Sequence, residues 1–156
     1  MEHDIDFKTL TPDDFANKLT GYFSGTFNDN LGVKVYKYEP GYCICGVDIK
    51  PEFLNPLHGV HGGFLFTLAD TAAGLVAVDL TGQATVTTAH SSIQYLNPAI
   101  HLDRIFAEAI NIKNGKRIAY IDVNLWTEDH LLLAKASFTF SRIILDHVKI
   151  QDIVKE

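Results

Sequence analysis

One acidic residue, Asp70, lies in the middle of a long apolar segment and needs a physical explanation. Residues 64–80 are otherwise almost entirely Phe, Leu, Ala, Val, Thr and Gly, so the helix that they predict is apolar on nearly every face and buried. An ionised carboxylate is costly to bury unless a partner group compensates its charge. A catalytic carboxylate would account for Asp70. So would a structural acid that reaches solvent at the helix edge or accepts hydrogen bonds from a neighbouring segment.

Two glycines, Gly62 and Gly63, stand at the predicted start of this helix. Glycine lets a ligand approach the bare backbone amides, and the helix dipole favours negative charge at this end. A carbonyl oxygen that becomes an oxyanion during acyl transfer is one such ligand. A simple turn at these two glycines is the alternative.

The spacing of Gly62 and Asp70 restricts how they could work together. An α-helix rises about 1.5 Å per residue, which places Asp70 about 12 Å along the axis from Gly62. A reacting carbonyl must lie within about 3 Å of both the attacking oxygen and the oxyanion donor, so one helix cannot supply both groups to one substrate. If both residues are catalytic, the acid comes from a second copy of the chain, with two such helices antiparallel across a two-fold axis. The spacing therefore predicts a homodimer with two equivalent, shared sites.

The composition and charge argue against several classes of protein. The chain has 156 residues and a net charge of −6, which fits a single domain over residues 1–156 with a sizeable core. Its basic residues are scattered, which argues against a nucleic-acid partner. The acidic N-terminal residues have no apolar run and do not resemble a signal peptide, and the segment 64–80 is at the short limit for a membrane span. We therefore expect a cytoplasmic protein with neither nucleic-acid nor membrane partners.

The two cysteines, Cys43 and Cys45, predict free thiols. On a strand they would face the same side, and they lie too close in sequence for an easy disulfide. A metal site would need further ligands nearby. We therefore expect neither a metal nor another cofactor.

The remaining segments predict an α+β fold. Thr11-Pro12-Asp13-Asp14 indicates the start of an N-terminal helix over about 11–24, with Thr11 as the N-cap, and the apolar helix runs from about Gly62 to Leu80. Six segments have strand-like composition: 31–38, 42–49, 84–97, 104–113, 117–127 and 131–143. Asn114-Gly115 is a strong hairpin signal between two of them. This order predicts an antiparallel sheet that curls around the apolar helix, with a core over about 30–143 and a short C-terminal tail.

The pattern Asn55…His61-Gly62-Gly63…Asp70, followed by Tyr95-Leu96-Asn97-Pro98, resembles the hotdog-fold acyl-CoA thioesterases. Within the 4-hydroxybenzoyl-CoA thioesterase group it is most similar to the branch of the phenylacetate-pathway enzymes and human thioesterase superfamily member 2. The likeness covers roughly residues 30–142. It implies a hotdog fold, in which an antiparallel sheet wraps around one long buried central helix, and homodimers that commonly pair into tetramers. Hotdog dehydratases carry a different His/Glu arrangement, which this sequence lacks.

The resemblance implies a catalytic role for each matching residue. Asp70 matches the acid that attacks the thioester or activates water for that attack, and Gly62 matches the residue whose amide polarises the carbonyl. Asn55 matches the loop amide that helps to place the carbonyl or the water. His61 matches the residue that flanks the leaving group, although a structural place at the helix start is the alternative for it. Thr88 falls where the family often has a Ser or Thr that assists the acid.

An acyl-CoA substrate would also need groups that hold its phosphates, which bind cations or amides. The candidates are one glycine and four basic residues: Gly63, Arg104, Lys113, Lys116 and Arg117. Each basic residue could equally be an ordinary solvated position. The aromatic residues that could shape an acyl pocket, or simply pack in the core, are Phe53, Phe64, Phe66 and Tyr95.

Two residues depart from the family pattern. Leu102 stands near the position where the family usually has a glycine, and the second histidine, His58, is outside the usual motif. The predicted function is hydrolysis of an acyl-CoA thioester to a free acid and coenzyme A. The alternatives are a non-catalytic hotdog protein that binds acyl-CoA, which a blocking Leu102 would favour, and a thioesterase that acts on acyl-carrier protein.

Overall fold

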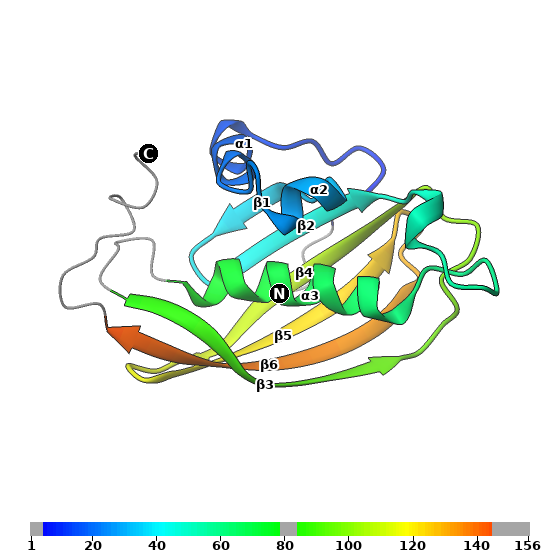
Figure 1. The fold of residues 1–156 in the computed structure, drawn as a ribbon. Helices are drawn as coiled ribbons and strands as arrows, with labels where there is room; N and C mark the ends of the chain where they lie inside the picture. The colour runs from blue at the N-terminus through cyan, green and yellow to red at the C-terminus, as the bar shows by residue number, and fades with distance from the viewer. Residues whose placement is uncertain (1–4, 79–83, 145–156) are drawn as a thin grey trace.

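The computed structural model describes residues 5–78 and 84–144, which form a curved antiparallel sheet with one long helix packed against it (Figure 1). The strands are β1 Lys34–Glu39, β2 Tyr42–Asp48, β3 Ala84–Tyr95, β4 Arg104–Asn114, β5 Ile118–Thr127 and β6 Leu132–Ile144. The helices are α1 Asp14–Gly21, α2 Phe27–Leu31, the 3₁₀ turn η1 Pro51–Phe53 and the long helix α3 Gly62–Ala77. The strands lie in the order β1-β2-β4-β5-β6-β3. The predicted α+β layout, with a sheet wrapped around one central helix, is confirmed.

Helix α3 is buried on one side only, so the prediction that it is buried on nearly every face is wrong. The buried residues recur every three or four positions along the side that faces the sheet: Phe64, Leu65, Leu68, Ala69, Ala72, Ala73, Val76 and Ala77. The other side, which includes Phe66, Thr67, Asp70 and Thr71, is half-exposed. Apolar composition does not distinguish a helix enclosed by its own chain from one that leaves a face for another molecule. The helix ends at Ala77, before the predicted end at Leu80, because the backbone of Val78 is extended. Leu80 itself lies outside the described residues.

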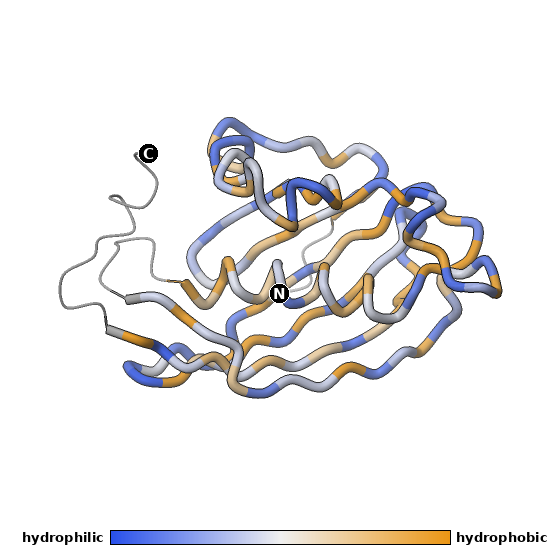
Figure 2. The backbone as a smooth tube through the Cα atoms, in the orientation of Figure 1, coloured by the Kyte–Doolittle hydropathy of each residue, from blue (hydrophilic) through white to orange (hydrophobic). Residues whose placement is uncertain are grey.

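The strands bury alternate residues against α3, as their period of two requires. Cys43, Cys45, Ala107 and Ala109 point toward the helix and are fully buried. The two free thiols lie 3.8 Å apart, sulfur to sulfur. Figure 2 shows the alternation of apolar and polar residues along the strands. Small residues on the sheet and alanines on α3 allow the helix to lie close to the strands.

The opposite face of the sheet is partly covered by the N-terminal segment. Phe7 stacks on Phe106 with ring centroids 4.9 Å apart, and both belong to a second apolar cluster with Tyr36, Tyr42 and Ile44. Burial of these aromatic rings fixes the segment that precedes α1 on the sheet.

The N-terminal helix starts later than the sequence predicts. Its N-cap is Asp13, whose carboxylate accepts a hydrogen bond from the Ala16 amide, and not Thr11. The helix ends at Gly21, and a second helix, α2, follows at Phe27–Leu31. We did not predict α2, because a helix of five residues has too few turns for a detectable period. None of the helices in the described residues is long and apolar enough to cross a membrane.

The packing between the two aromatic residues beside Gly46 makes this glycine sensitive to substitution. A Cβ at position 46 would lie 2.7 Å from Tyr36 Cε2 and 2.9 Å from Phe106 Cδ1. We expect Gly46→Ala to lower the free energy of unfolding by about 1–3 kcal/mol, because the rings must shift to admit the methyl group. Urea unfolding measures this change. The control is Gly21→Ala, where a Cβ meets nothing within 4 Å, and equal midpoints for the two variants would contradict the prediction.

Candidate active site

The carboxylate of Asp70 faces a cavity of about 510 Å³ beside the half-exposed side of α3. Thr88, on strand β3, donates a hydrogen bond from its hydroxyl to Asp70 Oδ1 at 2.9 Å. The two residues are 18 positions apart in sequence, and the sheet brings them together because β3 passes alongside α3 (Figure 1). A carboxylate that is open to a cavity and held by one hydroxyl can attack a carbonyl or take a proton from water.

Aromatic side chains form much of the wall of this cavity. Those that line it are Phe23, Phe27, Phe66 and Phe140. Helix α2 is tied to α3 by Thr71, whose hydroxyl lies 3.0 Å from Asn28 Oδ1 and 2.9 Å from the Thr67 carbonyl. Of the four aromatic residues that we considered for an acyl pocket, Phe66 lies here. Phe53 and Phe64 are instead buried and stacked on each other at 4.1 Å.

The first turn of α3 forms the second part of the candidate site. His61 is the N-cap, and its Nδ1 accepts a hydrogen bond from the Gly63 amide at 2.9 Å. The Gly63 amide is therefore engaged by the cap and is not free to bind a substrate. The Gly62 amide has no acceptor within the described part of the chain, as is usual for the first amides of a helix. Of the two glycines, Gly62 thus offers the open donor.

The N-cap hydrogen bond also determines which ring nitrogen of His61 carries the hydrogen. A backbone amide can only donate, so Nδ1 is the acceptor, and the neutral ring has its hydrogen on Nε2. The side chain lies at the surface. His61 therefore presents an N–H donor beside the Gly62 amide.

Asn55 lies next to Gly62 and is fixed by its own loop. Its Oδ1 accepts hydrogen bonds from the amides of Leu57 at 2.9 Å and Gly59 at 3.2 Å. Asn55 and Gly62 line a second cavity of about 350 Å³ together with Tyr95. With its oxygen occupied, Asn55 has its side-chain NH₂ left to donate to a bound molecule.

The structure thus brings Asp70 together with Thr88, and Asn55 and His61 together with Gly62, but it does not bring the two groups together. Asp70 and Gly62 line different cavities and lie about 12 Å apart along the axis of α3. Within one chain there are therefore two half-sites: an acid with its hydroxyl partner, and a cluster of N–H donors.

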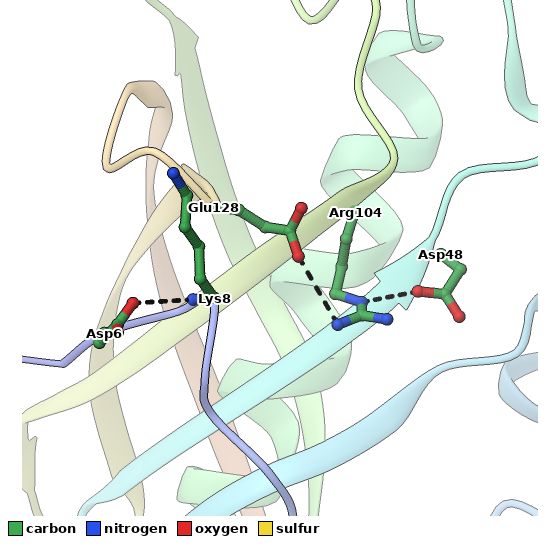
Figure 3. Close-up of polar contacts among 5 residues, drawn as sticks. All are labelled: Asp6, Lys8, Asp48, Arg104 and Glu128. Carbon is green, nitrogen blue, oxygen red and sulfur yellow. Dashed lines mark hydrogen bonds and ion pairs between the residues drawn. The ribbon is translucent and has the colours of Figure 1, made fainter.

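Arg104 lies away from both half-sites, on the face of the sheet opposite α3. Its Nε lies 2.6 Å from Asp48 Oδ1, and its guanidinium also faces Glu128 at 3.6 Å (Figure 3). The same guanidinium stands 5.9 Å from the Tyr36 ring centre. Two carboxylates therefore already compensate the charge of Arg104.

The other three basic candidates cluster at one turn. Lys113 lies near the end of β4, and Lys116 and Arg117 lie in the predicted hairpin turn between β4 and β5. All three side chains are exposed, and none forms an ion pair with another described residue. This hairpin lies at the end of the sheet near the C-terminus of α3 (Figure 1).

Thioesterases are among the known proteins to which this chain is similar. A family profile described as the thioesterase superfamily matches residues 57–134, which include His61, Gly62, Asp70 and Thr88. Acyl-coenzyme A thioesterase PaaI of Escherichia coli is 29% identical over 104 residues, covering 67% of this chain and 73% of the relative. The medium/long-chain acyl-CoA thioesterase YigI of Salmonella typhimurium is 28% identical over 144 residues, with 80% and 92% covered. The solved structure of thioesterase HI1161 from Haemophilus influenzae shares the fold, with a TM-score of 0.78 at 23% identity and with 88% and 98% covered.

Proposed function

Because this chain belongs to the thioesterase superfamily, we propose that it hydrolyses acyl-CoA thioesters at a site that two copies of the chain build together. Its α+β layout is the hotdog fold. Its relatives include enzymes named for hydrolysis of acyl-CoA, so the chain is a thioester hydrolase. The observation that carries the proposed site is the carboxylate of Asp70, which Thr88 holds in a cavity next to the half-exposed face of α3.

The proposed mechanism uses both half-sites. The Gly62 amide and the Asn55 NH₂ donate hydrogen bonds to the carbonyl oxygen of the thioester and stabilise the charge that develops on it. The Asp70 carboxylate then either attacks the carbonyl carbon, giving an anhydride that water hydrolyses, or takes a proton from the attacking water. In both routes the carbon–sulfur bond breaks and its electron pair leaves with the thiolate. Thr88 keeps the acid oriented by donating to Oδ1.

We propose a homodimer because one chain cannot complete this geometry. The half-exposed side of α3 is only partly covered by its own chain, and β3 is an edge strand of the sheet. An edge strand carries unpaired amides and carbonyls that a second copy can satisfy. Pairing of two β3 edges about a two-fold axis would place two α3 helices antiparallel, with Asp70 of one copy near Gly62 of the other.

We also propose that two dimers pair into a tetramer and that the protein is cytoplasmic. Ile110, Ile118 and Tyr120 are exposed on the face of the sheet away from α3, and such apolar side chains could support a pairing of dimers. The proposed cytoplasmic location rests on the two free thiols, Cys43 and Cys45. Neither prediction affects the proposed chemistry.

The phosphates of coenzyme A need cations that are not already paired. Lys113, Lys116 and Arg117 meet this condition, whereas Arg104 is held by Asp48 and Glu128. In a dimer with antiparallel α3 helices, the hairpin of one copy would lie toward the helix start of the other. We propose that these three side chains, rather than Arg104, attract the nucleotide end of the substrate.

The experiment that tests the proposed role of Gly62 compares two substitutions. Gly62→Ala and Gly62→Pro both add a Cβ that would approach the Tyr95 ring at 3.1 Å, but only proline removes the N–H. Proline is favoured at the first helical position, and His61, with φ −62° and ψ 133°, already has the backbone that a residue before proline adopts. We expect kcat of Gly62→Pro to be about 10²-fold or more below that of Gly62→Ala, because an oxyanion donor is lost.

The assay follows release of coenzyme A with a thiol-reactive dye over a panel of acyl-CoA esters, including phenylacetyl, hydroxybenzoyl, medium-chain and long-chain acyl groups. Equal rates for the alanine and proline variants would contradict the role of the amide. A wild-type protein that binds these esters without releasing thiol would contradict the enzymatic function itself. Turnover of acyl-carrier-protein thioesters with none of coenzyme A esters would instead identify a different carrier.

A further inference from the structure

Tyr95, the last residue of β3, reaches across to the first turn of α3. Its hydroxyl donates a hydrogen bond to the Gly62 carbonyl at 2.7 Å. Its Cζ and Oη lie 3.1 Å from the point where a Cβ on Gly62 would be. The ring therefore occupies the space that a side chain at position 62 would need. Its hydroxyl is hydrogen-bonded to the Gly62 carbonyl, which the small glycine leaves accessible.

The Gly62 carbonyl and the Gly63 amide belong to one peptide group. On its carbonyl side this peptide accepts from Tyr95 at 2.7 Å, and on its amide side it donates to His61 Nδ1 at 2.9 Å. A hydrogen bond to a peptide oxygen strengthens the donor at the nitrogen of the same peptide, because consecutive hydrogen bonds polarise one another. Tyr95 is thus connected to the imidazole of His61 by a continuous chain of two hydrogen bonds.

The donor and the acceptor of each of these two hydrogen bonds are fixed. Burial raises the pKa of Tyr95 above its usual value of 10.0, so its hydroxyl remains protonated and able to donate at neutral pH. At the other end, the Gly63 amide requires Nδ1 to accept, so the hydrogen of the neutral ring is on Nε2.

We propose that Tyr95 is a positioning residue for thioester cleavage, which acts through the Gly62–Gly63 peptide to hold His61 as an Nε2–H donor for the departing sulfur. This inference rests on the proposed function. When the carbon–sulfur bond breaks, its electron pair goes to sulfur, and the Nε2–H stabilises the thiolate by a hydrogen bond while keeping its proton. The thiolate then takes a proton from water.

The kinetic test uses Tyr95→Phe, which removes the hydroxyl and keeps the ring against Gly62. Two thioesters with the same acyl group are compared: the coenzyme A ester, whose alkyl thiol is a poorer leaving group, and a thiophenol ester, whose aryl thiolate leaves without help. We expect kcat for the coenzyme A ester to fall about tenfold with little change in KM, and kcat for the aryl ester to fall less than about twofold. An equal fall for both esters would overturn the proposal, because it would indicate a packing role only.

A double-mutant cycle tests whether Tyr95 acts through His61. His61→Asn keeps a good N-cap residue but removes the imidazole. In that background we expect Tyr95→Phe to lower kcat for the coenzyme A ester by less than about twofold, because the group on which it acts is gone. A tenfold loss in both backgrounds would show that Tyr95 works independently of His61.

A measurement that does not depend on activity separates this inference from the proposed function. NMR of ¹⁵N-labelled histidine reports which ring nitrogen carries the hydrogen, and the His61→Asn variant assigns the signal. We expect the Nε2–H tautomer of His61 in the wild type and a larger fraction of the Nδ1–H tautomer in Tyr95→Phe. An unchanged tautomer in Tyr95→Phe would overturn the positioning role even if the enzyme is active. A shifted tautomer in a protein that hydrolyses no thioester would contradict the proposed function and leave only the structural link.

Discussion

Replacing Asp70 by asparagine lowers kcat for acyl-CoA hydrolysis by about 10³-fold or more, while KM changes by less than about threefold. The side chains of Asp and Asn have nearly the same shape, so the cavity and the position of α3 are kept. Asparagine can accept the hydrogen bond that Thr88 donates at 2.9 Å, but its amide can neither attack a carbonyl nor take a proton from water. The loss therefore falls on the chemical step and not on substrate binding.

Two sets of variants define the specificity of this effect. Asp122→Asn is the matched control, because Asp122 is an exposed carboxylate on the outer face of the sheet that is bonded to Ser137, and it should retain wild-type turnover. Thr88→Val should lower kcat about tenfold by removing one hydrogen bond to a charged group, whereas Thr88→Ser should restore it. Turnover by Asp70→Asn within about tenfold of the wild type would show that another group performs the reaction.

Mixing two inactive variants restores about a quarter of wild-type activity if the site is shared between copies. One variant is Asp70→Asn, which lacks the acid, and the other is Gly62→Pro, which lacks the amide donor. Random exchange of equal amounts makes half of the dimers mixed, and each mixed dimer has one intact site and one doubly defective site. The activity is measured after mild unfolding and refolding of the mixture, with mixed dimers confirmed by mass.

The control for this experiment places both substitutions in one chain and mixes it with an equal amount of the wild type. Shared sites make every mixed dimer inactive, so activity should fall after exchange from about half to about a quarter of the wild type. If each site lies within one chain, the first mixture remains inactive and the second stays at half. If the site is shared, subunit exchange therefore raises the activity of the first mixture and lowers that of the second.

Local patterns in the sequence predict much of this arrangement. The strand segments, the Asn114-Gly115 hairpin and the start of α3 at Gly62 follow from residue types within a few positions of one another. The division into two half-sites follows as well, because the helix rise alone separates Gly62 from Asp70. These properties depend on neighbours along the chain.

Contacts between distant segments depend on register and packing, which short-range patterns do not encode. The sequence does not reveal that Arg104 is occupied by Asp48, which is 56 residues away, or that α2 lies over α3. It also does not show which side of an apolar helix remains open, because burial of α3 is decided by how far the sheet reaches around it. The hydrogen bonds of Thr88 to Asp70 and of Tyr95 to Gly62 exist because β3 passes beside α3 in the folded chain. The local sequence therefore determined the chemical groups and their spacing along the helix, and the tertiary structure decided their partners and their access to a second molecule.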